Sequence, residues 1–443
     1  MPASTGRRNV RSSYRGRHLS GHWAPNIDPV IGSGRGRLRG VDGDRARDEP
    51  WLTRGVAGIG SASLLSDAGH EVTTSLLPSF LTSTIHAPAA ALGVIEGVAD
   101  GLAGVARLAG GALADDPHRR SRVAVGGYAA TAVLSASVGA TSSVWQVGLL
   151  RAGAWVARGL RVPARNALLA DVVPRQAYGR AYGFERAMDN LGAIVGPLLA
   201  IGLVSLVGVR WAMGLSVVPG LLAAAAIVYA VRHTPRPTVR TRARVRLRVR
   251  SVLRGQLGRL LTAVAAFEVG NVATTLLILR ATELLTPTRG LQTATTIALG
   301  LYAAHNAVAA AASVPAGRLA DRLGSRGPLW TLAIGFAAMA TAYATFAATG
   351  SAVGVLAIAF VLAGTGIAAV ETAEHAAVAA LAPEDVRGSA FGLLAAVQAG
   401  GNLAASAVAG VLWTAVSPTV AFGYLVGWQV LALVGLIATN DRR

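Results

Sequence analysis

Long apolar segments follow one another along this chain from Trp51 to Asn440, with short polar stretches between them. A helix needs about 20 mostly apolar residues to cross the hydrocarbon core of a bilayer. The pattern therefore predicts an all-α membrane protein with about twelve transmembrane helices. The expected spans are 54–85, 88–112, 122–141, 144–172, 180–207 and 211–232, followed by 256–284, 291–318, 328–348, 352–381, 388–414 and 419–438.

The composition supports a membrane location and excludes several kinds of chemistry. Hydrophobic residues make up 53% of the chain and charged residues 14%, against roughly 25% charged residues in soluble domains. The absence of cysteine excludes disulfides and thiolate metal sites. Every basic residue is arginine, so there is no lysine for a P-loop or for a Schiff base. Any pumping must draw on an ion gradient or a partner, and we expect no cofactor.

The formal charge of +19 is concentrated in two stretches, the first 50 residues and the segment 233–255. Basic runs can bind nucleic acid, but these flank apolar spans. Arginine-rich loops stay on the cytoplasmic side of a membrane, so we expect no nucleic-acid partner. Residues 1–50 lack apolar periodicity and are expected to form a disordered cytoplasmic tail.

Arginines near the span ends also predict the topology. The loops after every second span carry them, and the opposite loops contain little more than Arg210 and Arg289. This places both termini in the cytoplasm, which requires an even number of spans. We expect a multi-pass protein of the plasma or inner membrane that functions as a monomer.

Three blocks of sequence occur twice in the same order. Residues 111–123 match 317–329, residues 174–183 match 383–392, and residues 70–77 match 270–277, at offsets of about 200 to 209. The repeat predicts two homologous six-helix halves, 51–232 and 256–440, joined by the arginine-rich linker 233–255. Parallel repeats of this kind are a transporter architecture.

The first repeated block combines small residues, an aspartate and arginines at a predicted loop. Glycine lets two helices approach closely, and an aspartate is favoured beside a helix N-terminus. Such a cluster could hold the two halves together in one state and release them in another; the alternative is a signal of topology only. Its two copies contain Gly111, Asp115, Arg119 and Arg120, and Gly317, Asp321, Arg322, Gly324 and Arg326.

On these two copies, the chain resembles the major facilitator superfamily, which repeats the pattern G-x-L-A-D-R-x-G-R-K after spans 2 and 8. The second copy is good, whereas Asp116 and His118 depart from the pattern in the first. The resemblance implies that the cluster is a gating motif on the cytoplasmic side. It also implies a secondary transporter whose halves rock about a central site.

A third motif lies in the predicted span 180–207, where Gly192, Gly196 and Pro197 resemble the G-x-x-x-G-P motif of family members that export by antiport. Proline kinks a helix and the glycines permit close packing. The motif favours export over uptake. An ordinary packing seam is the alternative.

Charged residues inside spans are expensive and usually face a cavity or a partner. Asp67 and Glu71 are four residues apart, so they share a helix face. Mutual repulsion favours binding of a proton to one of them, which makes them candidates for proton coupling. Glu96 and Arg151 are further candidates, because this arginine could pair with an acid in one conformation and release it in another. The alternative is a set of fixed ion pairs, which we expect for Glu185, Arg186 and Asp189.

We expect the substrate to contact Glu71, Arg151 and Asn271 between spans 1, 4, 7 and 10. Glu371, Glu374 and His375 are interpreted as a polar helix end, since their spacing does not match a metal motif. The sequence thus predicts a proton-coupled exporter of a small solute. The alternatives are an importer or uniporter on the same fold, and a membrane sensor or enzyme on a transporter-like scaffold.

Overall fold

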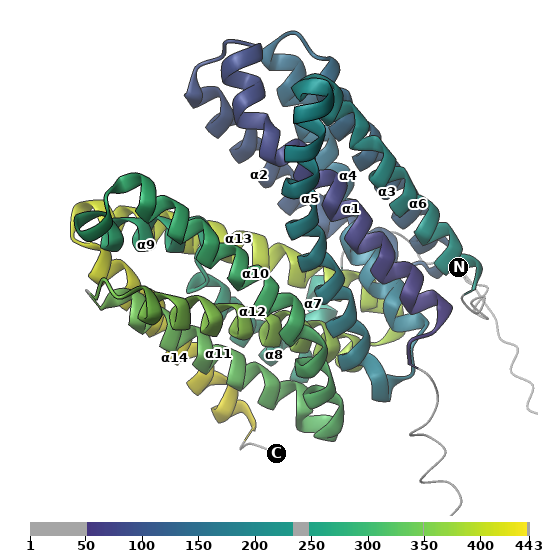
Figure 1. Cartoon of the computed structure of the whole chain (residues 1–443). Coiled ribbons are helices and arrows are strands. Elements are labelled where there is room, and N and C mark those ends of the chain that lie inside the picture. The colour runs from purple at the N-terminus through teal and green to yellow at the C-terminus, as the bar shows by residue number, and fades with distance from the viewer. Residues whose placement is uncertain (1–50, 234–247, 349, 441–443) are drawn as a thin grey trace, which may run out of the picture. The chain divides into compact units, whose positions relative to one another are not determined.

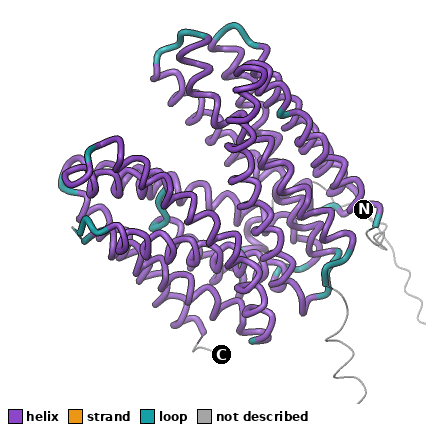
Figure 2. The backbone as a smooth tube through the Cα atoms, in the orientation of Figure 1, coloured by secondary structure: helices purple, strands orange, loops and turns teal. Residues whose placement is uncertain are grey.

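The computed structural model describes residues 51–233, 248–348 and 350–440, and these residues form helices without a single strand (Figure 2). The expected tail 1–50 and most of the linker lie outside the described residues. The first half contains α1 (Arg54–Ser79), α2 (Ala89–Ala114), α3 (Pro117–Ser137), α4 (Val144–Asp171), α5 (Tyr178–Leu215) and α6 (Val217–Arg232). After the short α7 (Val249–Val252), the second half contains α8 (Gly255–Val269), α9 (Thr274–Arg289), α10 (Leu291–Arg322), α11 (Gly327–Ala347), α12 (Val353–Leu381), α13 (Arg387–Ala415) and α14 (Pro418–Asn440).

The helices correspond to the expected spans in order and number, if α8 and α9 together count as one span (Figure 1). Among the described residues, eight helical stretches are long and apolar enough to cross a membrane by length and composition alone. Helices α1, α2 and α4 are not among these eight stretches, and each carries at least three charged residues. The prediction of an all-α fold of about twelve transmembrane helices in two six-helix bundles is confirmed.

Local sequence sets the helix ends. Thr53 caps α1, because its hydroxyl accepts a hydrogen bond from the amide of Val56. Asp116 caps α3 in the same way, and Pro117 follows at the first helical position. Between the expected spans 180–207 and 211–232, the chain turns at Gly208, whose φ of 76° is accessible to glycine.

The expected span 256–284 is interrupted in the middle, a feature that its apolar pattern does not predict. Helix α8 ends at Val269, and α9 begins only at Thr274. The equivalent residues of the first half, 70–73, lie inside the continuous helix α1. The interruption begins at Gly270 and Asn271, both poor helix formers, whereas the first half has histidine and glutamate there.

Side chains from neighbouring helices bond the backbone groups that this interruption frees. The hydroxyl of Tyr343 accepts a hydrogen bond from the backbone amide of Val272 at 3.3 Å, and the hydroxyl of Ser406 accepts one from the backbone amide of Ala273 at 3.0 Å. The amide nitrogen of Gln429 donates to the carbonyl oxygen of Gly270 at 2.9 Å, and Asn402 donates to that of Asn271 at 2.8 Å. A broken helix is tolerated at membrane depth when its backbone is satisfied in this way.

The two halves touch at one end, where glycines bring helix backbones together. We call this the motif end; it comprises the chain segments 115–116, 172–177, 323–326 and 382–386. A Cβ atom on Gly317 of α10 would lie 2.1 Å from the carbonyl oxygen of Gly179 of α5, and one on Gly111 of α2 would lie 2.7 Å from that of Gly388. Further from the motif end on α2, Cβ atoms on Gly93, Gly97, Gly101 and Gly104 would meet nothing within 4 Å.

The replacement Gly317→Val should lower the melting temperature of the purified protein. The added side chain must push the α10 backbone away from α5, and overpacking of this kind costs about 1–3 kcal/mol. Thermal unfolding in detergent micelles measures the effect. Gly300→Val on the same helix is the matched control, because a Cβ there meets nothing within 4 Å. Equal melting temperatures for the two variants would contradict the close contact between the halves.

Candidate functional site

At the motif end, each half supplies an aspartate that caps a helix of the other half. Asp115 follows the last residue of α2, and it accepts hydrogen bonds from the amide of Ser389, at 2.7 Å, and from its hydroxyl. Asp321 of α10 accepts from the amides of Gly179 and Arg180 at the start of α5, at 2.7 and 3.0 Å. A carboxylate at a helix N-terminus satisfies free amides and the helix dipole together. We call these two contacts the reciprocal caps.

The arginines of the repeated motif differ in whether they form ion pairs. Arg120 is 2% exposed; it bonds the carbonyl oxygen of Ala114 and forms an ion pair with Asp171. Asp171 also pairs with Arg387 of the other half, at 3.2 Å. Arg119 pairs with Asp116 at 3.3 Å. In the described part of the chain, Arg322 and Arg326 form no ion pair, and Gly324 adopts a φ of 62° in the turn between them.

Burial raises the pKa of Asp115 above its ordinary value, and the hydrogen bonds from Ser389 act in the opposite direction. A buried carboxylate depends on such donors for its stability. The cap therefore stabilises the charged form of Asp115 only while the two halves remain in contact at this end.

The G-x-x-x-G-P motif of α5 packs against the two carboxylate positions of α1. A Cβ on Gly192 would lie 2.9 Å from the Cβ of Asp67, and one on Gly196 would lie 2.3 Å from the Cβ of Glu71. Both pairs are spaced by four residues, so one helix face fits the other. The motif thus brings α5 close to the acidic face of α1, and Pro197 follows within the same helix.

The structure pairs the candidate coupling residues with arginines of α4. Arg151 bonds both carboxylate oxygens of Glu96, at 3.0 and 3.2 Å, and lies 3.6 Å over the ring of Trp155. Asp67 pairs instead with Arg158, at 2.9 Å. Glu71 forms no ion pair among the described residues. Arg151 therefore pairs with Glu96 and not with Asp67 or Glu71.

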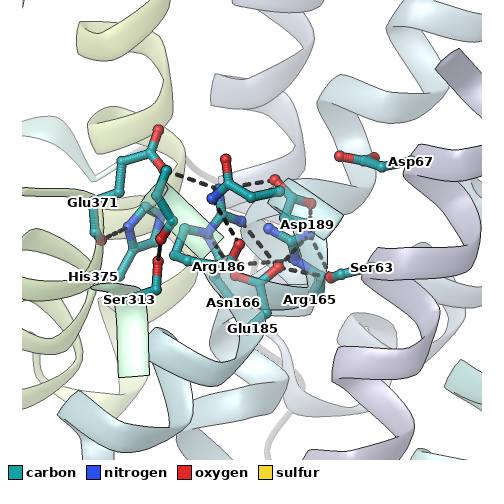
Figure 3. A network of polar contacts seen from close by, with 12 residues as sticks. Ser63, Asp67, Arg165, Asn166, Glu185, Arg186, Asp189, Ser313, Glu371 and His375 are labelled. Carbon is teal, nitrogen blue, oxygen red and sulfur yellow. Dashed lines mark hydrogen bonds and ion pairs between the residues drawn. The ribbon is translucent and has the colours of Figure 1, made fainter. Parts of the chain in front are cut away.

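A larger ion-pair network lies beside Asp67 (Figure 3). Glu185 forms ion pairs with Arg165 and Arg186, each at 2.7 Å. Asp189 forms ion pairs with the same two arginines, at 3.6 and 3.2 Å. The carboxyl groups of Asp67 and Asp189 are neighbours. Arg186 also reaches toward Glu371 of the other half, at 3.9 Å. Glu185, Arg186 and Asp189 thus form ion pairs with one another and with Arg165, as expected from the sequence.

Next to this network is a cavity of about 560 Å³ that both halves line. Of the three residues expected to contact substrate, Asn271 lines it, whereas Glu71 and Arg151 are not among the lining residues. The first half contributes Gly97, Asp100, Arg107, Arg158, Arg161, Val162, Arg165, Arg186 and Asp189. The second half contributes Glu268, Asn271, Ala273, Glu371, His375, Ala395, Gln398, Ala399, Asn402, Leu403 and Ser406.

The prediction that Glu371, Glu374 and His375 form a polar helix end is wrong. The group lies inside α12, which continues to Leu381, and Glu374 is fully buried. Glu371 and His375, one helical turn apart, face the cavity, and Glu374 accepts a hydrogen bond from Gln398 of α13. The one-turn spacing of Glu371 and His375 was the signal that could have placed them on a cavity wall.

Comparisons with known proteins agree with this architecture. The family model described as Major Facilitator Superfamily matches residues 59–304 and 260–443. These ranges cover most of the sequence, and the chain belongs to the Major Facilitator Superfamily. It is a transmembrane transporter of that family.

Two relatives of known sequence are themselves described as uncharacterized. An uncharacterized MFS-type transporter of Methanocaldococcus jannaschii is 26% identical over 387 residues, which cover 86% of this chain and 93% of that protein. An uncharacterized protein of Mycobacterium bovis is 30% identical over 207 residues, or 45% of this chain and 50% of that protein. This chain therefore matches about half of the mycobacterial protein.

Solved structures with the same fold include a human organic anion transporter, with a TM-score of 0.70 and 18% identity, covering 88% of this chain and 100% of that chain. A bacterial homologue of the iron transporter ferroportin, in an outward-facing state, gives a TM-score of 0.68 and 17% identity over 88% and 100% of the two chains. At these identities the likeness shows the fold alone.

Removing one reciprocal cap should destabilise the structure more than removing a surface ion pair. Asp321→Ala leaves two amides of α5 without an acceptor and also removes an ion pair with Arg180. The loss of a helix cap alone costs about 0.5–2 kcal/mol. The control is Asp385→Ala, which removes an exposed pair with Arg248, and such pairs contribute about 0–1 kcal/mol. Thermal unfolding should show a lower melting temperature for Asp321→Ala alone. A drop of equal size in both variants would contradict the importance of the cap.

Proposed function

We propose that this protein is a proton-coupled secondary transporter that exports a small solute by alternating access. The main supporting observation is a polar cavity at the contact of the two repeated halves, lined by Arg158 and Asp189. Asp67 lies behind this lining, paired with Arg158 and next to the carboxyl group of Asp189. Alternating access in repeat-built transporters is a rocking of the halves around such a central site.

The arginine-rich loops support a cytoplasmic motif end, with both termini in the cytoplasm and the protein in the plasma membrane. The reciprocal caps then close the cytoplasmic side, and the cavity lies beyond them, toward the outside. This is an outward-facing arrangement, the state in which the similar ferroportin homologue was solved. The transporter works as a monomer in the bilayer, with protons and a small solute as partners and neither nucleic acid nor cofactor.

The proposed proton coupling acts through the ion pairs of the first half, because protonation of an acid weakens its ion pair with an arginine of α4. Arg158 bonds both carboxylate oxygens of Asp67, at 2.9 and 3.4 Å. A proton arriving on Asp67 removes the charge that holds Arg158, and it relieves the repulsion from Asp189. Glu71 lies one turn away on the same face, and Glu96 holds Arg151 in the same way. Proton binding thereby changes which helices of the first half are joined by ion pairs.

Export is favoured over import by the G-x-x-x-G-P motif and its packing. Gly192 and Gly196 set α5 against the coupling residues Asp67 and Glu71. A change of charge on α1 is therefore transmitted directly to α5, the helix whose N-terminus Asp321 caps. This connects the proton site to the contact that closes the motif end.

Everted membrane vesicles test the proposal with a panel of small compounds. In vesicles with an acidic lumen, an exported compound should enter and drive protons out, which a pH-sensitive dye reports for each member of the panel. Asp67→Asn and Glu71→Gln should reduce the response to the level of vesicles that lack the protein. Glu384→Gln, an exposed change at the motif end, is the control and should respond like the wild type.

Each contrary result has a separate meaning. Compound uptake without proton movement would indicate a uniporter, and proton movement in the same direction as the compound would indicate an importer. An unchanged proton response in both variants would overturn the assignment of coupling to Asp67 and Glu71.

A further inference from the structure

The two walls of the cavity carry opposite charge. The lining residues of the first half include five arginines and two aspartates, whereas the lining residues of the second half include Glu268 and Glu371 and no arginine. Most of the first-half charges are already paired within that half, as described above. What the cavity can offer a solute is therefore decided by the charges that have no ionic partner.

On the wall of the first half, Arg107, Arg161 and Asp100 form no ion pair among the described residues. Asp100 accepts a hydrogen bond from the indole nitrogen of Trp155, and the two arginines leave this wall with an excess of positive charge. Arg161 is 2% exposed and lies 3.9 Å over the ring of Tyr128. Its Nε and Nη1 atoms are buried without a hydrogen-bond partner in the described part of the chain. Arg107 donates to the carbonyl oxygen of Ala395 at 3.0 Å. Unpaired arginines at membrane depth are costly, and an anionic group would satisfy them bidentately.

On the opposite wall, the unpaired charge is Glu268, which is 4% exposed. Its carboxylate accepts a hydrogen bond from the side-chain amide of Asn271 at 3.0 Å and forms no ion pair among the described residues. It lies in the last turn of α8, where the helix breaks off into 270–273. The C-terminal end of a broken helix carries partial negative charge and favours cations.

These observations place an unsatisfied positive site and an unsatisfied negative site on facing walls of one cavity. We infer that the transported solute is a zwitterion, with a carboxylate or similar anionic group at Arg107 and Arg161 and an amine at Glu268 and the break in the helix. The inference rests on the proposed function, because it takes this cavity as the transport site, and it adds the charge class of the substrate.

The test is a binding panel with two scaffolds in four charge states each. Leucine and leucyl-leucine are the zwitterions; their N-acetyl forms are anions, their amides are cations, and their N-acetyl amides are neutral. Isothermal titration with the purified protein should show that one zwitterion binds at least about tenfold more tightly than its three derivatives, because each derivative leaves a buried charge unpaired. Stronger binding of a singly charged or neutral form, or no binding of any probe, would overturn the inference.

Single substitutions test which wall binds the anionic group of the solute and which wall binds its amine. Arg161→Gln should reduce the preference for the zwitterion over the amide, and Glu268→Gln the preference over the N-acetyl form. Arg107→Gln provides a second test of the arginine site if Arg161→Gln does not fold. Arg259 of α8 lines a separate pocket, so the control variant Arg259→Gln should leave both preferences unchanged. An unchanged preference in the variants that fold would also overturn the inference.

Failure here and failure of the proposed function can be told apart. If the vesicle assay finds exported anions or cations that drive proton movement, the transporter assignment stands and the zwitterion assignment falls. If zwitterions bind with the predicted pattern but no compound moves protons, the charge class stands and proton coupling falls.

Discussion

Many of the charges inside the helices of the first half are paired with one another, and the arrangement of those helices depends on this pairing. Charged side chains at membrane depth cost several kcal/mol unless they face water or a partner. Helix α4 shows the consequence, because Arg151, Arg158 and Arg165 hold acids on α2, α1 and α5 in turn. One arginine-bearing helix thus links three neighbours, and a change in charge on any of those acids alters how the half is held together.

The contact between the halves at the motif end is built differently. Asp115 is satisfied at the start of α13, and Asp321 at the start of α5, where the guanidinium of Arg180 also pairs with it at 2.8 Å. Such caps are worth little individually, and glycines at the crossings let the backbones approach without interlocking side chains. The contact at the motif end thus combines helix caps, close glycine crossings and the ion pairs of Asp171 with Arg387 and of Asp321 with Arg180.

Much of the fold could be predicted from the sequence, because apolar segment length and the repeated blocks are properties of the chain itself. The four-residue spacings put Asp67 and Glu71 on one face of α1, and Gly192 and Gly196 on one face of α5, but they do not say that these two faces meet. The nearness of Asp189 to Asp67 could not be predicted, since it depends on the register between α1 and α5. The break at 270–273 had a local signal in Gly270 and Asn271, yet its stability depends on Gln429 and Asn402, more than 130 residues away.

The central claim is that the reciprocal caps hold one end closed while the other end is open, and that the two ends exchange. Because the chain has no cysteine, pairs of spin labels can be introduced directly, at Arg119 and Ser325 for the motif end and at Ser142 and Arg289 for the opposite end. Pulsed electron-spin distances should show that Asp115→Ala combined with Asp321→Ala lengthens the first distance and shortens the second. A longer motif-end distance with no change at the opposite end would contradict the account.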